Sequence, residues 1–338
     1  MNAKVLILGP TFFGYNYSIQ RAFDRLGYQT KVVQYDEPVH PFNWKNKVLR
    51  KLFPSSKKLR EKSRRLFNAF ITEEFKNYGP DFVFIYNGDI LEPETIRLFR
   101  QQSKVAVWML DGAFRHPDSV AIAPEVNVYF CFEKSDVDKL RSLGIHAYFL
   151  PQGYDPAVYY PMALKKDIDI LFVGALYRYP ERIRLLKLAA KELGNTYNMK
   201  VYGWYKPIYK NPVKWLFRER RDIFMNKNIP PEEVNKLYNR AKVCINIHHA
   251  QSVEGANPKV FEICGAGAYQ LVDYNHFIAS VYSAGEVSFF HSDRDFIEKI
   301  KELMTTDTSS SAEEAQRKVA RFHTFECRIR EAMEVLGV

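Results

Sequence analysis

The sequence predicts an α/β protein made of two Rossmann-like domains, each with a parallel sheet. Three observations predict this class. Apolar runs of strand length alternate with helical patterns along the whole chain, and the runs are apolar at successive positions, as in strands covered on both faces. The pattern also restarts after the proline-rich stretch 151–161, which has linker composition. We expect domains at 1–152 and 153–316, with a last helix in 317–338 that crosses back to the first domain.

The first half contains six runs that favour strands. The first run, KVLILG, is followed by a glycine-containing turn, and the helix near Glu92 has a proline in its first turn, which is a common helix start. In chain order we expect strands at 4–9, 29–35, 81–88, 104–112, 127–133 and 147–151. We expect helices at 16–26, 92–102 and 135–144, and a long helix after the first basic segment that ends near residue 77.

The second half repeats this alternation. Proline and acidic residues mark the first turn of the helix at 230–241, and the small residues GAG at 265–267 end a helix that feeds an apolar strand. In chain order we further expect strands at 167–176, 199–204, 242–249 and 287–292, and helices at 180–194, 293–304 and 313–337.

Composition indicates a globular protein and excludes several other classes. Of the 338 residues, 46% are apolar and 15% aromatic, enough for substantial cores. No stretch approaches the roughly 20 apolar residues that a spanning helix needs, and the N-terminus lacks a clear signal-peptide cleavage site, so we expect a cytoplasmic protein. The four cysteines have no close pair, which predicts reduced thiols and no metal site.

The net charge of +10 is concentrated in two segments. Residues 44–65 contain ten Lys or Arg against one acid, Glu61, and residues 206–221 form a second basic stretch. Both mix cations with Trp, Phe and Leu, as do segments that rest on anionic lipid headgroups. A solvated helix face is an equally good interpretation. Nucleic acid is not an expected partner, because no recognition motif accompanies the charge.

The stretch SVEGANPKVFEICGAGAYQLVDY (252–274) carries the main functional signal. Glu254 and Glu262 stand eight positions apart, and Lys259 lies between them at a loop-to-helix junction. A lysine and the N–H groups of a helix start attract phosphate, and a carboxylate accepts hydrogen bonds from a diol. This pattern favours a phosphorylated, polyhydroxylated ligand. In the competing interpretation Glu262 only complements the helix dipole.

The segment EGANPKVFE, with seven residues between its glutamates, resembles the E-x7-E motif of retaining GT-B glycosyltransferases. The segments NPKVFEICGAGAYQLVDY, ILFVGALYRYPERIRLL and WMLDG resemble the CgeB-like, spore-maturation-type branch of the group 1 glycosyl transferases. The resemblance is strong over about residues 168–275 and only architectural over the first half. It implies a GT-B fold with two facing domains and a nucleotide-sugar donor, with UDP as the expected nucleotide, held mainly by the second domain.

On this analogy Glu262 contacts the ribose, Lys259 the diphosphate and Glu254 the transferred sugar. The chain departs from the GT-B pattern after Gly174, where many of these enzymes have an arginine and this chain has an alanine. We therefore expect Arg178 to contact the diphosphate, and the retaining outcome is left open. The expected donor-binding residues are Gly174, Arg178, Trp204, Asn257, Lys259 and Glu262. Trp204 is expected to stack on the base or meet it through backbone groups; an ordinary half-buried aromatic is the alternative.

Other polar residues follow expected strands. Asp111 is expected to position an acceptor hydroxyl, or to act as a base if transfer inverts the sugar. Asp89 and His116 lie in similar loops, and each of these residues could instead be structural. A buried, hydrogen-bonded histidine is the default reading of His248, whereas His249 is expected to touch sugar or phosphate. The expected catalytic residues are Asp111, Glu254 and His249.

Two further motifs carry little weight. The segment DID at 167–169 matches a metal-binding D-x-D pattern, but it precedes its strand and so lies at the wrong end for a site. The turn GPTFFG at 9–14 is not G-x-G-x-x-G, and Asp36 is the nearest acid to a dinucleotide pattern, so a dehydrogenase is a weak alternative.

Together these patterns predict a metal-independent glycosyltransferase that uses a nucleotide sugar. The acceptor is expected to be a cell-surface polymer, a lipid-linked glycan or a protein, with peripheral contact between the basic segments and an anionic membrane. A non-catalytic nucleotide- or glycan-binding protein with the same fold, and a nucleotide-sugar epimerase of GT-B architecture, are the alternatives.

Overall fold

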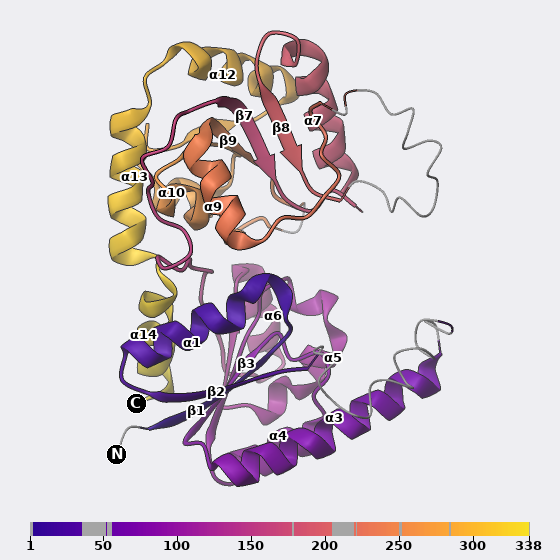
Figure 1. Cartoon of the computed structure of the whole chain (residues 1–338). Coiled ribbons are helices and arrows are strands. Elements are labelled where there is room, and N and C mark those ends of the chain that lie inside the picture. The colour runs from indigo at the N-terminus through magenta and orange to yellow at the C-terminus, as the bar shows by residue number, and fades with distance from the viewer. Residues whose placement is uncertain are drawn as a thin grey trace. The chain divides into compact units, whose positions relative to one another are not determined.

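The computed structural model describes residues 3–35, 52, 56–177, 179–204, 220, 222–249, 252–283 and 285–337. It divides into two compact units (Figure 1). Unit 1 comprises Met1–Gln152 and Phe325–Val338, and unit 2 comprises Gly153–Thr324. Both units are parallel α/β sheets covered by helices on both faces, as the alternating pattern predicts.

Unit 1 is built on a six-stranded parallel sheet in the order β2-β1-β3-β4-β5-β6. Apolar residues at successive positions of β1 are buried on alternate faces, so the run is apolar throughout. The strands are β1 (Lys4–Gly9), β2 (Gln29–Gln34), β3 (Phe82–Tyr86), β4 (Lys104–Trp108), β5 (Val128–Cys131) and β6 (Ala147–Phe149).

Helices cover both faces of this sheet. One face packs against α3 (Lys57–Tyr78), α4 (Pro93–Arg100), α5 (Pro117–Ile122) and α6 (Lys134–Ser142). The other face packs against α1 (Tyr15–Arg25) and α14 (Phe325–Leu336), which lie side by side in Figure 1. The connecting 3-10 turns are η1 (Phe12–Gly14), η2 (Ala113–Arg115) and η3 (Ala123–Glu125).

Unit 2 is built on a five-stranded parallel sheet in the order β11-β10-β9-β7-β8. Its strands are β7 (Ile168–Val173), β8 (Met199–Tyr202), β9 (Ala241–Asn246), β10 (Tyr269–Asp273) and β11 (Ser288–Phe290). Its helices are α7 (Pro180–Leu193), α9 (Pro231–Arg240), α10 (Lys259–Gly265), α11 (His276–Val281), α12 (Asp293–Thr305) and α13 (Ser309–Phe322). The helices α7 and α12 pack on one face, and α9, α10 and α13 contact the other side of the unit (Figure 1).

The end of the chain differs from the prediction in one respect. The single helix expected at 313–337 is two helices, α13 and α14, separated at His323 and Thr324. The break is explained by backbone pairing, because Tyr154 N donates to His323 O at 3.1 Å and Tyr154 forms a parallel bridge with Thr324. The segment that belongs to unit 1 at this end of the chain begins at Phe325. The predicted return of a C-terminal helix to the first domain is confirmed.

The basic segments lie largely outside the described residues. Residues 206–219 are not described, nor are residues 44–51 and 53–55, so the structure does not test their predicted contact with lipid. Within the described ranges, no helix combines the length and the apolar character that crossing a membrane requires.

Candidate functional site

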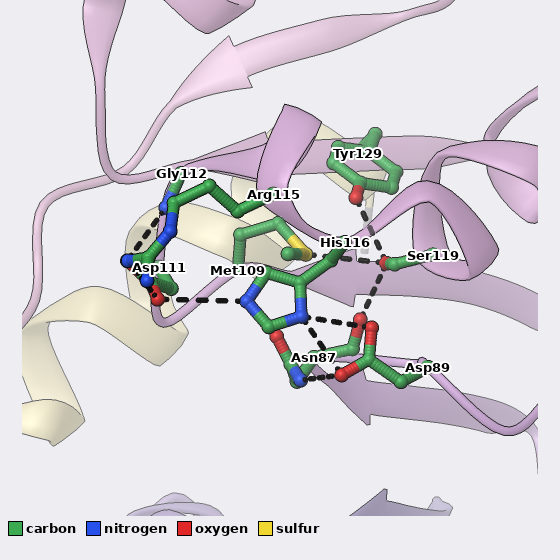
Figure 2. Close-up of polar contacts among 9 residues, drawn as sticks. All are labelled: Asn87, Asp89, Met109, Asp111, Gly112, Arg115, His116, Ser119 and Tyr129. Atoms are coloured by element: carbon green, nitrogen blue, oxygen red, sulfur yellow. Dashed lines mark hydrogen bonds and ion pairs between the residues drawn. The ribbon is translucent and has the colours of Figure 1, made fainter. Parts of the chain in front are cut away.

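Polar residues gather at the C-terminal ends of the strands, the edge at which parallel α/β sheets bind ligands. In unit 1 the loops after β3 and β4 bring together Asp89, Asp111, Arg115 and His116 (Figure 2). We refer to these four residues as the unit 1 cluster. The sequence marked the two aspartates and the histidine separately, and the structure shows that they contact one another.

The turn after β3 is fixed by the core beneath it. Asn87 has φ 81° and Gly88 has φ 86°, a conformation that few residues other than Gly, Asn and Asp adopt. The Asn87 side-chain Nδ2 donates to Asp89 Oδ2 at 2.6 Å. The buried Ser119 hydroxyl donates to the Asn87 backbone oxygen and lies 2.9 Å from the Tyr129 hydroxyl. The position of the Asp89 carboxylate is therefore set by packed residues.

His116 lies between two carboxylates. Its Nδ1 is 2.9 Å and 2.8 Å from the two oxygens of Asp89, and its Nε2 is 3.5 Å from Asp111 Oδ2 (Figure 2). Hydrogen bonding to Asp111, and then to Asp89, raises the pKa of His116 to about 9, against the opposing effect of burial. The imidazole is therefore protonated at neutral pH and carries an N–H on each nitrogen.

Asp111 is already engaged by several donors. Arg115 Nη1 donates to its Oδ2 at 2.7 Å, and the Gly112 N–H donates to its Oδ1 at 3.0 Å. A carboxylate shared by a guanidinium, an imidazolium and an N–H is a weak general base, although its remaining lone pairs still accept hydrogen bonds. With two carboxylates, one imidazolium and one guanidinium, the unit 1 cluster is close to neutral overall. Its chemistry suits the hydroxyl groups of a sugar or polyol better than an anion.

In unit 2 the loop that carries Glu254 is held by two asparagines. Asn275 Nδ2 donates to the backbone oxygens of Ser252, Val253 and Gly255 at 2.9, 3.0 and 3.1 Å. Asn257 exchanges side-chain hydrogen bonds with Asn246 at the end of β9, at 3.1 and 3.3 Å. Asn257, expected to bind the donor, thus ties the loop to the sheet through its side chain.

Glu262 is buried at the fourth position of α10, with 1% of its side chain exposed. Lys259 Nζ lies 3.7 Å from its Oε2, and Tyr159 hydrogen-bonds to the same carboxylate. Burial and the proximity of Glu262 raise the pKa of the Tyr159 hydroxyl, so the tyrosine stays protonated and donates to the carboxylate. The buried Tyr238 lies close enough for Glu262 to contribute to the raised pKa of its hydroxyl. Glu262 is thus part of a buried polar group, not simply a charge at a helix start.

The ends of β7 and β8 approach each other closely. Gly203 has φ 149°, and a Cβ at that position would lie 1.9 Å from Gly174 O. A Cβ at Gly174 would in turn lie 3.8 Å from Lys259 Cε. Gly174 and Lys259, both expected to bind the donor, are therefore neighbours. Trp204 follows Gly203 and is 50% exposed, and its backbone oxygen accepts from Tyr177 N at 2.7 Å.

Arg178 lies outside the described residues, so its expected contact with the diphosphate is a prediction. The structure places the nearby Arg182 at the strand ends instead. Arg182 donates from Nε to Ile247 O at 2.7 Å and from Nη1 to Ala175 O at 3.1 Å, and it stacks on Tyr179 at 4.3 Å. Its contacts with carbonyl oxygens join the loop after β7 to the segment after β9. No signal in the sequence separates this positioning role from ligand binding.

The two histidines after β9 have different surroundings. His248 is buried, and its Nδ1 and backbone N–H both donate to Asp273 Oδ1 at 2.9 Å. The His249 ring is half-buried and packs edge-on against Tyr179, with 5.3 Å between ring centroids. Asp273 was not among the expected site residues, although its position at the end of the strand YQLVD is a signal of the kind that selected Asp111.

The D-x-D segment serves the fold at the opposite edge of the sheet. Asp167 accepts from Arg240 Nε and Nη2 at 2.8 and 2.6 Å, and Asp169 pairs with Lys242 Nζ at 2.6 Å. Both aspartates lie at the start of β7. Among the described residues no group of three or more His, Cys, Asp or Glu side chains has an arrangement suited to a metal ion.

Comparison with known proteins shows which proteins this chain is similar to. Residues 178–334 match the model of a family described as glycosyl transferase-like. Spore protein CgeB of Bacillus subtilis (strain 168) is 23% identical over 239 residues, which cover 66% of this chain and 71% of that protein. The family model reaches residue 334, beyond the stretch of about residues 168–275 that carries the resemblance in the sequence.

Two solved structures are similar over nearly their whole length. Sucrose-phosphate synthase from Thermosynechococcus elongatus has a TM-score of 0.71 at 12% identity, with 99% of this chain and 98% of that chain covered. Anabaena HepE, solved in complex with UDP and glucose, has a TM-score of 0.61 at 10% identity, with 99% and 100% covered. The structures confirm the predicted GT-B fold, and the family model confirms the predicted class of enzyme, a glycosyltransferase.

Proposed function

Because residues 178–334 carry a glycosyl transferase-like domain and the whole chain has the GT-B fold, we propose that the protein transfers a sugar from a nucleoside diphosphate sugar to a hydroxyl group of an acceptor. The observation that carries the proposal is the segment 252–265, which presents two glutamates and a lysine at the C-terminal edge of the unit 2 sheet. UDP is the proposed nucleotide, supported by the UDP complex of Anabaena HepE.

In this proposal the donor lies along the strand ends of unit 2. Lys259 supplies a cation for the diphosphate, and Gly174, where a Cβ would lie 3.8 Å from Lys259 Cε, is its neighbour at the end of β7. Glu254 accepts hydrogen bonds from the transferred sugar, and the exposed Trp204 meets the base. Stabilisation of the leaving diphosphate by fixed cations is the main catalytic contribution, and it needs no metal ion.

The ribose contact of Glu262 requires a rearrangement. The carboxylate is 1% exposed and accepts from Tyr159, so a ribose hydroxyl reaches it only after Tyr159 gives up that hydrogen bond. The exchange gives the carboxylate a new donor, but the buried Tyr159 hydroxyl then needs another acceptor, and this sets the cost of ribose binding.

The unit 1 cluster is the proposed acceptor side. Its near-neutral set of donors and acceptors binds a hydroxyl, with Asp111 as an acceptor and His116 as a donor. A role for Asp111 as general base requires that it first lose its contacts with Arg115 or His116. His249, beside the Glu254 loop, is proposed to touch the donor sugar or phosphate.

The acceptor is proposed to lie at an anionic membrane or on an acidic polymer. The described start of α3 supports this: Lys57, Lys58, Arg60, Lys62 and Arg65 are all exposed there. Each cation near an anionic leaflet contributes about 1 kcal/mol to membrane binding. A surface of this kind would hold the enzyme beside a lipid-linked acceptor.

Calorimetric titration with UDP, GDP, dTDP and their sugars tests the donor proposal. We expect one nucleotide to bind, and Lys259→Met to weaken binding about 10- to 100-fold through loss of a charge-assisted contact. The matched control is Lys191→Met, on the exposed side of α7, which should bind as wild type. If no nucleotide binds at millimolar concentration, the proposal fails.

Glu262 needs a variant that preserves the buried polar group. Removal of a fully buried, paired carboxylate by Glu262→Ala leaves a cavity and unsatisfied partners, and is expected to cost about 2–4 kcal/mol of stability. Glu262→Gln keeps the shape and one acceptor, so a loss of nucleotide affinity in this variant reports on ribose binding and not on unfolding.

A further inference from the structure

His248 and Asp273 form a further polar contact at the strand ends of unit 2. His248 and Asp273 follow the adjacent strands β9 and β10. The carboxylate oxygen Oδ1 of Asp273 accepts from both the backbone N–H and the ring Nδ1 of His248, each at 2.9 Å. Two contacts to a single oxygen fix both the chain direction and the ring plane of His248.

This contact sets the tautomer of His248. An ionised carboxylate only accepts hydrogen bonds, so the proton of the neutral imidazole is on Nδ1. The lone pair of the neutral ring is therefore on Nε2. An aspartate that holds a histidine in this way leaves Nε2 as an oriented acceptor, which is the arrangement that many enzymes use to bind or deprotonate a hydroxyl group.

Nε2 of His248 has no hydrogen-bond partner among the residues that the structure describes, although only 1% of the side chain is exposed. Buried polar atoms without a partner are rare in folded proteins, because each one forfeits its hydrogen bond to water. An acceptor that is oriented by an aspartate and left without a donor indicates a place for a group that the protein chain does not supply.

The charges around His248 indicate which group fits. Asp273 places a carboxylate, 30% exposed, against the ring, and this charge disfavours a phosphate at the same point. Of the nearby cations, Arg182 bonds to Ala175 O and Ile247 O and lies close enough to Asp273 for the two charges to offset each other, whereas Lys259 lies beside Gly174. The diphosphate therefore belongs near Gly174, and a neutral hydroxyl suits the position at His248.

We propose that Nε2 of His248 accepts a hydrogen bond from a hydroxyl group of the sugar carried by the nucleotide donor, with Asp273 as the positioning residue. The inference rests on the proposed function, because it names a contact within the same donor site. His248 is followed by the loop that carries Glu254, so the same end of the sheet supplies two acceptors for sugar hydroxyls. His248 thereby contributes to recognition of the sugar, not of the nucleotide.

The test compares a UDP-sugar with UDP. Affinities are measured by calorimetry for UDP and for the tightest-binding of UDP-glucose, UDP-galactose and UDP-N-acetylglucosamine. His248→Asn keeps an amide N–H at the position of Nδ1, and so keeps the contact with Asp273, but removes Nε2. We expect it to weaken UDP-sugar binding about tenfold, the loss of one hydrogen bond, and to leave UDP binding within about twofold.

Two further variants separate this role from a structural one. His248→Gln places an amide at the position of Nε2 and should restore part of the lost affinity for the UDP-sugar. His291→Asn changes an exposed histidine of the same unit that stacks on Tyr274, and it should bind both ligands as wild type. A melting temperature for each variant within a few degrees of wild type shows that the fold is kept.

The outcomes are distinct. Equal weakening of UDP and UDP-sugar by His248→Asn overturns the inference, because it places the contact at the nucleotide. Unchanged binding of both ligands also overturns it and assigns Nε2 to a buried water. A wild-type protein that binds neither ligand removes the proposed function itself, whereas the first two outcomes leave that function standing.

Discussion

The protonation state of His116 is the clearest measurable property at the scale of single residues. Its pKa is raised to about 9 in the folded protein by Asp111 and Asp89, compared with 6.5 in an unperturbed histidine. Because the pKa is raised, the contacts of His116 with Asp111 and Asp89 stabilise the fold fully below about pH 6.5. This stabilisation is lost as the pH rises through about 9.

We therefore predict a pH-dependent effect of His116→Gln. At pH 6 the variant should lose roughly 1–3 kcal/mol of stability relative to wild type, and at pH 9.5 most of this difference should be gone. Urea unfolding at both pH values measures it. His146→Gln, at an exposed position of the same unit, is the control for the loss of a histidine side chain. A difference for His116→Gln that stays the same at both pH values would show that the imidazole is not held as a cation.

Contacts between residues far apart in the chain could not be predicted from the sequence. The pattern at 252–274 selected Glu254, Lys259 and Glu262 from one segment, but spacing alone could not show that Glu262 is buried against Tyr159. Tyr159 is 103 positions earlier in the chain, and only the fold brings the two together. Asp273 ends its strand as Asp111 does and could have been selected by that signal, but its contact with His248, which follows another strand, depends on the fold.

At the scale of secondary-structure elements, the close approach of β7 and β8 has a clear consequence. A Cβ at Gly203 would lie 1.9 Å from Gly174 O, and φ 149° is strained for any other residue. Gly203→Ala must therefore push the two strand ends apart, at an expected cost of about 2–3 kcal/mol. It should also weaken donor binding, because Gly174 lies next to Lys259.

The matched control for this variant is Gly27→Ala. Gly27 also has a positive φ, 87°, but a Cβ there would meet nothing within 4 Å. Only the backbone strain of about 1–2 kcal/mol is then expected, with nucleotide affinity unchanged. Thermal unfolding and a nucleotide titration on both variants make the comparison. Equal effects of the two variants on nucleotide affinity would show that the ends of β7 and β8 are not part of the donor site.

Regular elements were largely predictable, because continuous apolar runs and proline-marked helix starts are local signals. The 3-10 turns and the break between α13 and α14 were not. The break at His323 and Thr324 depends on pairing with Tyr154, about 170 positions earlier, and local helical propensity runs through it. Tertiary hydrogen bonds overrode propensity there.

At the scale of the whole molecule, the chain returns to unit 1 through α14. Its buried residues recur at helical spacing and pack on α1 and the sheet: Phe325, Ile329, Ala332, Met333 and Leu336. The Phe325 ring lies 5.9 Å from Tyr15 and 5.8 Å from Trp108, centroid to centroid. Unit 1 therefore depends on residues at both ends of the sequence.

Two neighbouring phenylalanines test this dependence. Phe325 is 2% exposed, so Phe325→Ala is expected to destabilise unit 1 by about 3–5 kcal/mol. Phe322 is 51% exposed, and Phe322→Ala should change stability by less than about 0.5 kcal/mol. Calorimetric unfolding distinguishes the two, and similar small losses would mean that unit 1 folds without support from α14.

The most direct test of glycosyl transfer is slow hydrolysis of the donor without an acceptor. The protein is incubated with each UDP-, GDP- and dTDP-sugar, and nucleoside diphosphate and free sugar are measured by chromatography. We predict release of both from one nucleotide sugar, undiminished by a metal chelator and reduced in Lys259→Met in step with its roughly 10- to 100-fold weaker binding. An intact donor that binds would indicate a binding protein, and conversion to another nucleotide sugar would indicate an epimerase; either result would contradict glycosyl transfer.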